Sequence, residues 1–241
     1  MGLTPAPIPP ETRAHLTAPP APRWCADLLA DPSLQPVRAS SRVKRPSTTS
    51  CALIGETLNT ENTFRAWQCF YRAGAGASSG RKNENENGNN STTPPPDADA
   101  ADELLILFSL GTGMDGHAGV LHGGILAVMF DELLGTLATT AIPQPQDKED
   151  VSGDWTPIYT VSLTIRFRRP LTTPGFVLGR AWCDDAGRRR TSYGRKVWVR
   201  GVLEDGEGGE VFAEGEAVYV EMKKREKKKT DNNDKRGMAR L

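Results

Sequence analysis

A glycine pair opens a long apolar segment of this chain, and the segment carries two adjacent acids in its middle. The segment from Gly123 to Ala141 reads GGILAVMFDELLGTLATTA and follows His122. Its composition predicts a buried helix, which ends near Ala141 because Pro143 cannot continue it. An ionised carboxyl in such a helix is unfavourable unless a partner or water compensates it, so Asp131 and Glu132 indicate a function.

The two glycines add a second chemical feature at the start of the same helix. The first N–H groups of a helix have no partner within it, and they form a ready site for an oxygen that carries negative charge. Gly123 and Gly124 occupy these positions. An anion site and a carboxylate on one helix together indicate acyl chemistry.

The composition limits the classes of function. The chain has 30 Lys and Arg residues and 30 Asp and Glu residues, so no overall charge favours nucleic acid or a membrane surface. No apolar run approaches the roughly 20 residues that cross a bilayer. Four scattered cysteines without C-x-x-C spacing, and the lack of a signal-peptide pattern, favour a reducing compartment and hence the cytoplasm. The late arginines and the prolines of the N-terminal region leave a mitochondrial transit peptide as an alternative.

Three regions are expected along the chain. Residues 1–62 form a Pro-rich arm and an irregular lead-in, in which about 1–22 are flexible and WCADLL is a short helix. Residues 63–222 form one domain with a disordered insertion at about 74–101, and residues 223–241 form a charged, disordered tail.

The domain should combine one helix with one antiparallel sheet. Around the helix, strand-like segments are expected at 63–72, 103–110, 158–168, 175–183, 191–203 and 210–222. The first two pair across the insertion, and the turn sequences DDAGRRR and EDGEGG make later neighbours antiparallel. In 158–168 the apolar residues alternate with polar ones, as expected when one face packs on a helix: Val161, Leu163, Ile165 and Phe167. The fold class is therefore α+β.

Two stretches, GHAGVLHGGILAVMFDELLGTLA and YTVSLTIRFRRPL, resemble the hotdog-fold acyl-CoA thioesterases, of the phenylacetate-pathway type and related eukaryotic enzymes. The resemblance implies a hotdog fold over about 63–222 without the insertion. It implies that the N–H of Gly123 stabilises an oxyanion and that Asp131 is the general base or nucleophile. It also implies that Thr160, ten residues before Pro170, helps to hold the attacking water. No cofactor is implied.

One position departs from the family. Related enzymes often have asparagine six residues before the motif histidine, where this chain has Gly116. Either His117 supplies the second donor, or the oxyanion site uses backbone N–H groups alone and is weakened by a few kcal/mol.

The spacing of Gly123 and Asp131 predicts a dimer. Eight residues span about 12 Å of helix, whereas a donor and a base for one carbonyl each lie about 3 Å from the reacting atoms. One helix cannot place both, but two antiparallel copies related by a twofold axis can. A homodimer, or a dimer of dimers, is therefore expected.

Each candidate residue also has a structural alternative. Asp131 could pair with Arg166, Thr160 could be an ordinary strand residue, and His122 could brace the helix entry instead of carrying protons. Glu132 points about 100° away from Asp131, so it is expected to face solvent or to bind a partner on its own helix. The alternative is that Glu132, and not Asp131, is the catalytic acid.

Three arginines of the strand at 158–168 and the turn after it, Arg166, Arg168 and Arg169, could hold the phosphates of coenzyme A or simply solvate the exposed face. The three histidines form no metal-binding pattern. The helix and N-terminal aromatics such as Trp24, Phe64 and Trp67 should bound the acyl pocket, and the acyl chain itself is not specified by the sequence.

The expected activity is hydrolysis of an acyl-CoA or related acyl thioester. Two alternatives remain at this point: a hotdog dehydratase or hydratase, against which the spacing from the glycine motif to Asp131 argues, and a non-catalytic acyl-CoA-binding or scaffold protein, which Gly116 favours.

Overall fold

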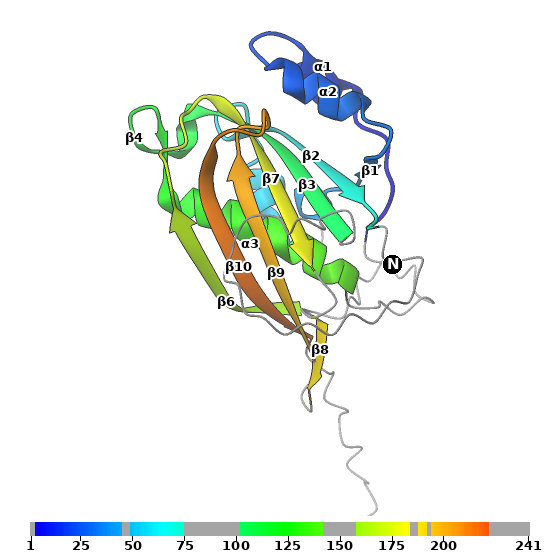
Figure 1. The fold of residues 1–241 in the computed structure, drawn as a ribbon. Coiled ribbons are helices and arrows are strands. Elements are labelled where there is room, and N and C mark those ends of the chain that lie inside the picture. Colours follow the sequence, from blue (N-terminus) through cyan, green and yellow to red (C-terminus); the bar gives the residue numbers. More distant parts are fainter. Residues whose placement is uncertain are drawn as a thin grey trace, which may run out of the picture.

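The computed structural model of the chain describes residues 3–44, 49–74, 102–141, 158–183, 188–191 and 194–221. The expected insertion after residue 74, the expected loop at 144–157 and the charged tail lie outside these ranges. The elements are arranged as one antiparallel sheet that curves around one long helix, α3 (Gly123–Ala141) (Figure 1). The expected α+β class and the central helix are confirmed.

The sheet has the strand order β1-β2-β3-β7-β9-β10-β6, and every pairing in it is antiparallel. A further strand, β8, pairs only with β9. The strand bounds are β1 (Gln35–Val37), β2 (Phe64–Arg72), β3 (Asp102–Leu110), β6 (Ile158–Phe167), β7 (Gly175–Cys183), β8 (Arg188–Thr191), β9 (Gly194–Glu204) and β10 (Val211–Glu221). The expected strands all form, and β2 pairs with β3 as predicted.

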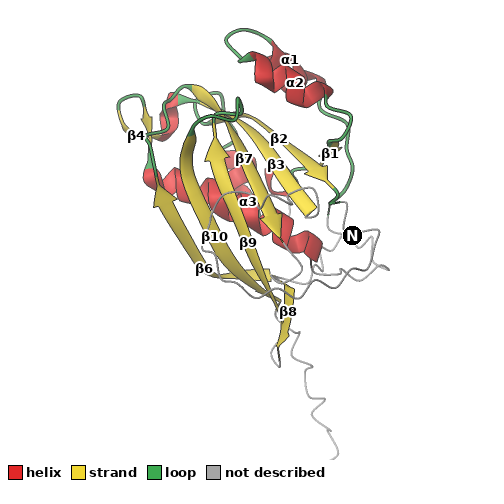
Figure 2. Ribbon diagram, in the orientation of Figure 1, coloured by secondary structure: helices red, strands yellow, loops and turns green. Residues whose placement is uncertain are grey.

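Short elements complete the chain. A two-stranded ribbon of β4 (Asp115–His117) and β5 (Val120–Leu121) leads into α3. The remaining helices are α1 (Pro10–Thr17), α2 (Arg23–Ala30), and the short turns η1 (Ser40–Arg42), η2 (Leu53–Thr57) and η5 (Thr112–Met114). Figure 2 shows that α1 and α2 lie apart from α3 and at the opposite end of the sheet from β6.

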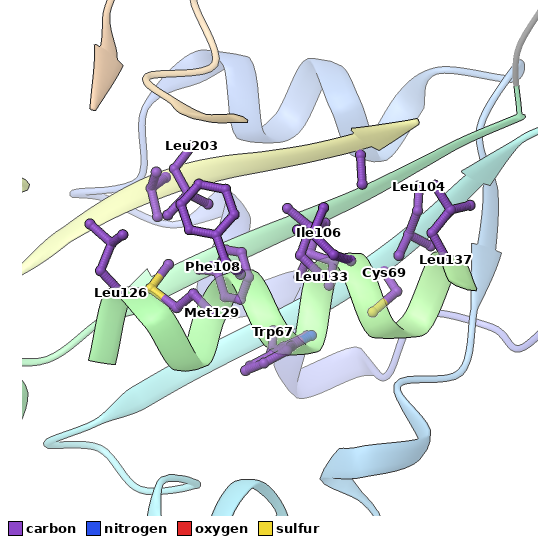
Figure 3. Close-up of a cluster of buried hydrophobic side chains, with 14 of the residues drawn as sticks. Trp67, Cys69, Leu104, Ile106, Phe108, Leu126, Met129, Leu133, Leu137 and Leu203 are labelled. Atoms are coloured by element: carbon purple, nitrogen blue, oxygen red, sulfur yellow. The ribbon is translucent and has the colours of Figure 1, made fainter. Parts of the chain in front are cut away.

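The core lies between α3 and the concave face of the sheet. The side chains of α3 with no exposed surface are Met129, Phe130, Leu133, Leu134, Leu137 and Ala138. Figure 3 shows the contact with Leu104, Ile106 and Phe108 of β3 and with Leu203 of β9. At Gly215 of β10 a Cβ would come within 2.5 Å of the Phe130 ring, so only glycine lets this strand approach the helix so closely. The helix is held by burial of apolar surface, at roughly 25 cal/mol per Å².

Strand β6 differs from the expectation of one buried apolar face. Among the described strands it forms an edge of the sheet and pairs only with β10. Leu163 and Ile165 are half-buried against the core, but Val161 and Phe167 keep 56% and 59% of their surface exposed. The alternation is present, but none of the elements that the structure describes fully covers Val161 and Phe167.

The N-terminal region is more ordered than its composition predicts. The prolines and alanines predicted a flexible arm over about residues 1–22. This prediction is wrong for residues 10–17, which form α1. Leu16 of α1 is fully buried and joins a second apolar cluster on the convex face of the sheet, with Trp24 and Cys25 of α2 and with Ala66, Phe70, Leu105, Leu107 and Leu178 of the strands. The expected short helix at 24–29 is confirmed as α2.

Removing the Leu16 side chain should therefore destabilise the protein, whereas a flexible arm would not respond. We expect Leu16→Ala to lower the free energy of unfolding by about 2–5 kcal/mol, the usual range for a buried leucine. Urea denaturation measures the effect, and Glu11→Ala, an exposed change on the same helix, is the matched control. Equal stability of the two variants would contradict the packing of α1.

By length and composition alone, Gly123–Thr140 of α3 could cross a membrane, contrary to the expectation that no segment would qualify. Its fully buried leucines pack on the sheet, as they do in the core helix of a folded domain.

Candidate active site

Asp131 and Thr160 meet in the structure although 29 residues separate them. Asp131 lies on α3 with its side chain exposed, and Thr160 lies on the adjacent strand β6. The Thr160 hydroxyl donates a hydrogen bond to Oδ1 of Asp131 at 2.8 Å. This partner differs from the alternative of an ion pair with Arg166. The pair fixes a carboxylate beside a hydroxyl, an arrangement that can hold and deprotonate a water molecule.

Tyr219 of β10 contacts the same part of α3. Its hydroxyl donates to the backbone oxygen of Asp131 at 3.1 Å. Gly135 makes room for the ring, because a Cβ there would already lie 3.4 Å from it. Burial, and then the negative charges of Asp131 and Glu132, raise the pKa of Tyr219, so the hydroxyl stays a donor. Sequence reasoning missed Tyr219, because the segment 210–222 was predicted only as a strand, without a role for any of its side chains.

At the start of α3, Gly123 and His122 have different surroundings. The N–H of Gly124 donates to Nδ1 of His122 at 2.9 Å, so this ring nitrogen is an acceptor that caps the helix. Among the described residues the N–H of Gly123 has no hydrogen-bond partner. The residue is exposed, and a Cβ on it would lie 3.5 Å from the Phe167 ring. An unpaired N–H at a helix start is a donor available to an oxyanion.

Gly116, the glycine that departs from the family pattern, lies in the β4–β5 ribbon before α3. A Cβ on Gly116 would lie 3.1 Å from both Cα and Cδ2 of His122. A larger residue there would displace the histidine that caps α3. The neighbouring His117 is exposed, and within the described part of the chain it forms no hydrogen bond through its ring.

Two of the three arginines on and after β6 have acidic partners. Arg168 pairs with Glu214 at 2.9 Å, and Arg169 pairs with Glu210 at 2.5 Å. Arg166 is exposed and has no ion pair with another described residue. Exposed ion pairs contribute only about 0–1 kcal/mol, so they present little barrier to binding a phosphate instead.

A cavity of about 380 Å³ opens beside Asp131 and Thr160. We expected N-terminal aromatic residues in its wall, but Phe64 and Trp67 lie in the main core and Trp24 in the second cluster. The N-terminal region instead contributes small and polar residues. The lining consists of Leu3, Arg38, Ser40, Ser41, Cys51, Asp131, Glu132, Gly135, Thr136, Thr139, Ile158, Thr160 and Tyr219.

Glu132 is part of this wall and does not simply face solvent, as we had expected. It is half-buried, and Ser41 of η1, which is outside its own helix, lines the same cavity. Burial raises the pKa of Glu132, the charge of Asp131 raises it further, and hydrogen bonding by Ser41 partly opposes both. The partner could not be found from helical spacing, because it is 91 residues away.

Replacing Glu132 by glutamine should change how stability depends on pH. A pKa that is higher in the folded state means that stability falls as the pH rises from the ordinary value of 4.5 through the raised value. The uncharged variant lacks this loss, so Glu132→Gln should gain stability relative to wild type over that window, by about 1.4 kcal/mol per pKa unit. Thermal unfolding across the window measures it. A difference that is independent of pH would contradict the buried position of the carboxyl.

Together, one helix wrapped by an antiparallel sheet and a carboxylate in the middle of that helix define a hotdog-fold protein. Residues 118–204 match the family model of the thioesterase superfamily. This stretch contains Gly123, Asp131 and Thr160, and it is the part of the chain that is similar to that superfamily. No curated protein matches the chain in sequence.

Solved structures with a similar fold carry related descriptions. The acyl-CoA hydrolase from Staphylococcus aureus, in complex with butyryl coenzyme A, coenzyme A and coenzyme A disulfide, has 15% identity and a TM-score of 0.40, over 51% of this chain and 64% of that one. Thioesterase superfamily member 2 from Mus musculus has 16% identity and a TM-score of 0.37, over 50% of this chain and 81% of that one.

Proposed function

We propose that this protein hydrolyses an acyl-CoA thioester to the free acid and the thiol. The observation that carries the proposal is the hydrogen bond between Thr160 and Asp131 at the rim of a cavity of about 380 Å³. A carboxylate held beside a hydroxyl, with space next to it for an acyl group, is suited to activating water against a carbonyl.

The reaction follows from these groups. Water held by Thr160 and Asp131 attacks the thioester carbon while Asp131 takes its proton. The carbonyl oxygen becomes an oxyanion that accepts a hydrogen bond from an N–H at a helix start. The C–S bond then breaks, and the departing thiolate recovers the proton, which leaves an acid and a thiol. Direct attack by Asp131, followed by hydrolysis of the anhydride, gives the same products.

The oxyanion donor should come from a second copy of the chain. Gly123 lies eight residues from Asp131, about 12 Å along the helix, which is too far for one carbonyl. The edge strand β6 leaves three large apolar side chains more than half exposed, as expected of a surface that another copy covers: Tyr159, Val161 and Phe167. Because Phe167 also lies against Gly123, an interface at this edge reaches the helix start. Arg166, exposed on the same strand, is suited to contact a phosphate of coenzyme A.

A second function is favoured by Gly116. Its contact with His122 leaves no side-chain donor at this position, so the site could bind acyl-CoA without turnover.

An assay of the purified chain with a panel of acyl-CoAs separates these functions. Release of one thiol per thioester, lost in Asp131→Asn, supports hydrolysis. Binding without thiol release indicates a ligand-binding protein, and loss of enoyl absorbance indicates a hydratase.

A further inference from the structure

The cavity has polar lining residues that the proposed hydrolysis does not use. Besides Asp131 and Thr160, which bond each other, the lining includes Glu132 of α3 and Ser41 of η1. An acyl group whose carbonyl is beside Asp131 therefore occupies the same cavity as Glu132 and Ser41. Successive helix residues point about 100° apart, and this spacing separates the two carboxyls into different parts of one cavity.

Glu132 has unused hydrogen-bonding capacity. A carboxyl has two oxygens with about four acceptor positions, and a bond from the neighbouring Ser41 hydroxyl would use only one of them. The Ser41 hydroxyl can also accept a bond from a ligand. A half-buried carboxyl that loses its water to an alkyl chain would be left unpaired, which costs more than an ordinary hydrogen bond gains.

The size of the cavity limits the acyl group. A volume of about 380 Å³ is near the lower end of ligand pockets, which span about 300–1,000 Å³. Apolar surface comes from Leu3, Ile158 and the Tyr219 ring, while Gly135 leaves part of the helix wall open. The space therefore suits a short acyl group with both apolar and hydrogen-bonding parts. A terminal carboxylate would meet the charges of Asp131 and Glu132 and is disfavoured.

We propose that Glu132 and Ser41 form a specificity subsite that selects short acyl groups carrying a hydroxyl, which donates to a free acceptor position of Glu132. The proposal rests on the proposed function for the position of the thioester. Glu132 determines which acyl group is bound, whereas Asp131 acts on the carbonyl.

Binding of two stable thioethers tests the subsite without requiring turnover. Calorimetry with the full chain would compare S-butyl-coenzyme A with S-(3-hydroxybutyl)-coenzyme A. We expect the hydroxylated compound to bind at least about tenfold more tightly, since sites built to bond a hydroxyl discriminate strongly against its absence. In Glu132→Leu the preference should disappear, and in Glu132→Gln, which keeps the shape and an acceptor, it should be partly retained. Glu61→Leu, in an exposed loop, is the matched control and should keep the preference.

The outcomes separate this proposal from the proposed function. The subsite proposal is overturned by any of three results: equal affinities of the wild type for the two thioethers, no binding of either thioether, or a preference that persists in Glu132→Leu. If Glu132→Leu does not fold, the reduced preference in Glu132→Gln decides. Thiol release from butyryl-CoA and 3-hydroxybutyryl-CoA is measured separately. Its complete absence overturns hydrolysis while the binding ratio still decides the subsite.

Discussion

Asp131→Asn should lower kcat for a hydrolysed acyl-CoA by at least about a hundredfold, because removing a general base costs about 10²–10⁴ in rate. Asparagine keeps the size of the side chain and can still accept the bond from Thr160, so the fold should not change. Thiol release measures the rate, and size-exclusion chromatography with light scattering checks the assembly.

Two variants serve as controls for this assignment. Glu132→Gln, assayed with a plain acyl-CoA, should lower kcat much less than Asp131→Asn, because Glu132 points about 100° around the helix from Asp131. Thr160→Val removes the hydroxyl that bonds Asp131, and it should have an intermediate effect. A larger loss in Glu132→Gln than in Asp131→Asn would mean that Glu132 is the catalytic acid.

Mixing two inactive variants should restore activity if the site is shared between two copies. Asp131→Asn lacks the base, and Gly123→Pro lacks the N–H donor while proline remains acceptable at a helix start. In a heterodimer one composite site has both groups intact and the other has neither. Activity should rise from the low level of each homodimer to as much as half that of the wild type.

The mixing experiment needs proof that subunits exchange between the dimers, and a control for the added bulk of a side chain at position 123. Native mass spectrometry shows whether heterodimers form. Gly123→Ala keeps the N–H, and its Cβ would lie at an ordinary contact distance of 3.5 Å from Phe167, so it separates loss of the donor from added bulk. An inactive mixture despite proven heterodimers would rule out the shared site and favour a water network along one helix.

Local sequence patterns were sufficient for the elements that form the hotdog core. The glycine pair and Pro143 bound an apolar stretch that is α3, and the alternating segments became strands with nearly the expected ends. These properties depend on backbone conformation and on side-chain periodicity, which neighbouring residues determine. The resemblance to the hotdog thioesterases, and not local periodicity, pointed to Asp131 together with Thr160, and these two residues are hydrogen-bonded in the structure.

The surroundings of the site depended on contacts between distant parts of the chain. Leu16 is buried because α1 and α2 pack on β2, β3 and β7 at the convex face of the sheet, whereas the proline and alanine content of the N-terminal region argued against order at α1. Glu132 lines a cavity together with Ser41, which is far away in the sequence, and Gly116 lies close to His122. The sequence by itself therefore determined the helix and the strands, and it indicated the candidate site residues on them. Only the tertiary structure decided which side chains enclose the cavity, because burial and pairing depend on residues far away in the chain.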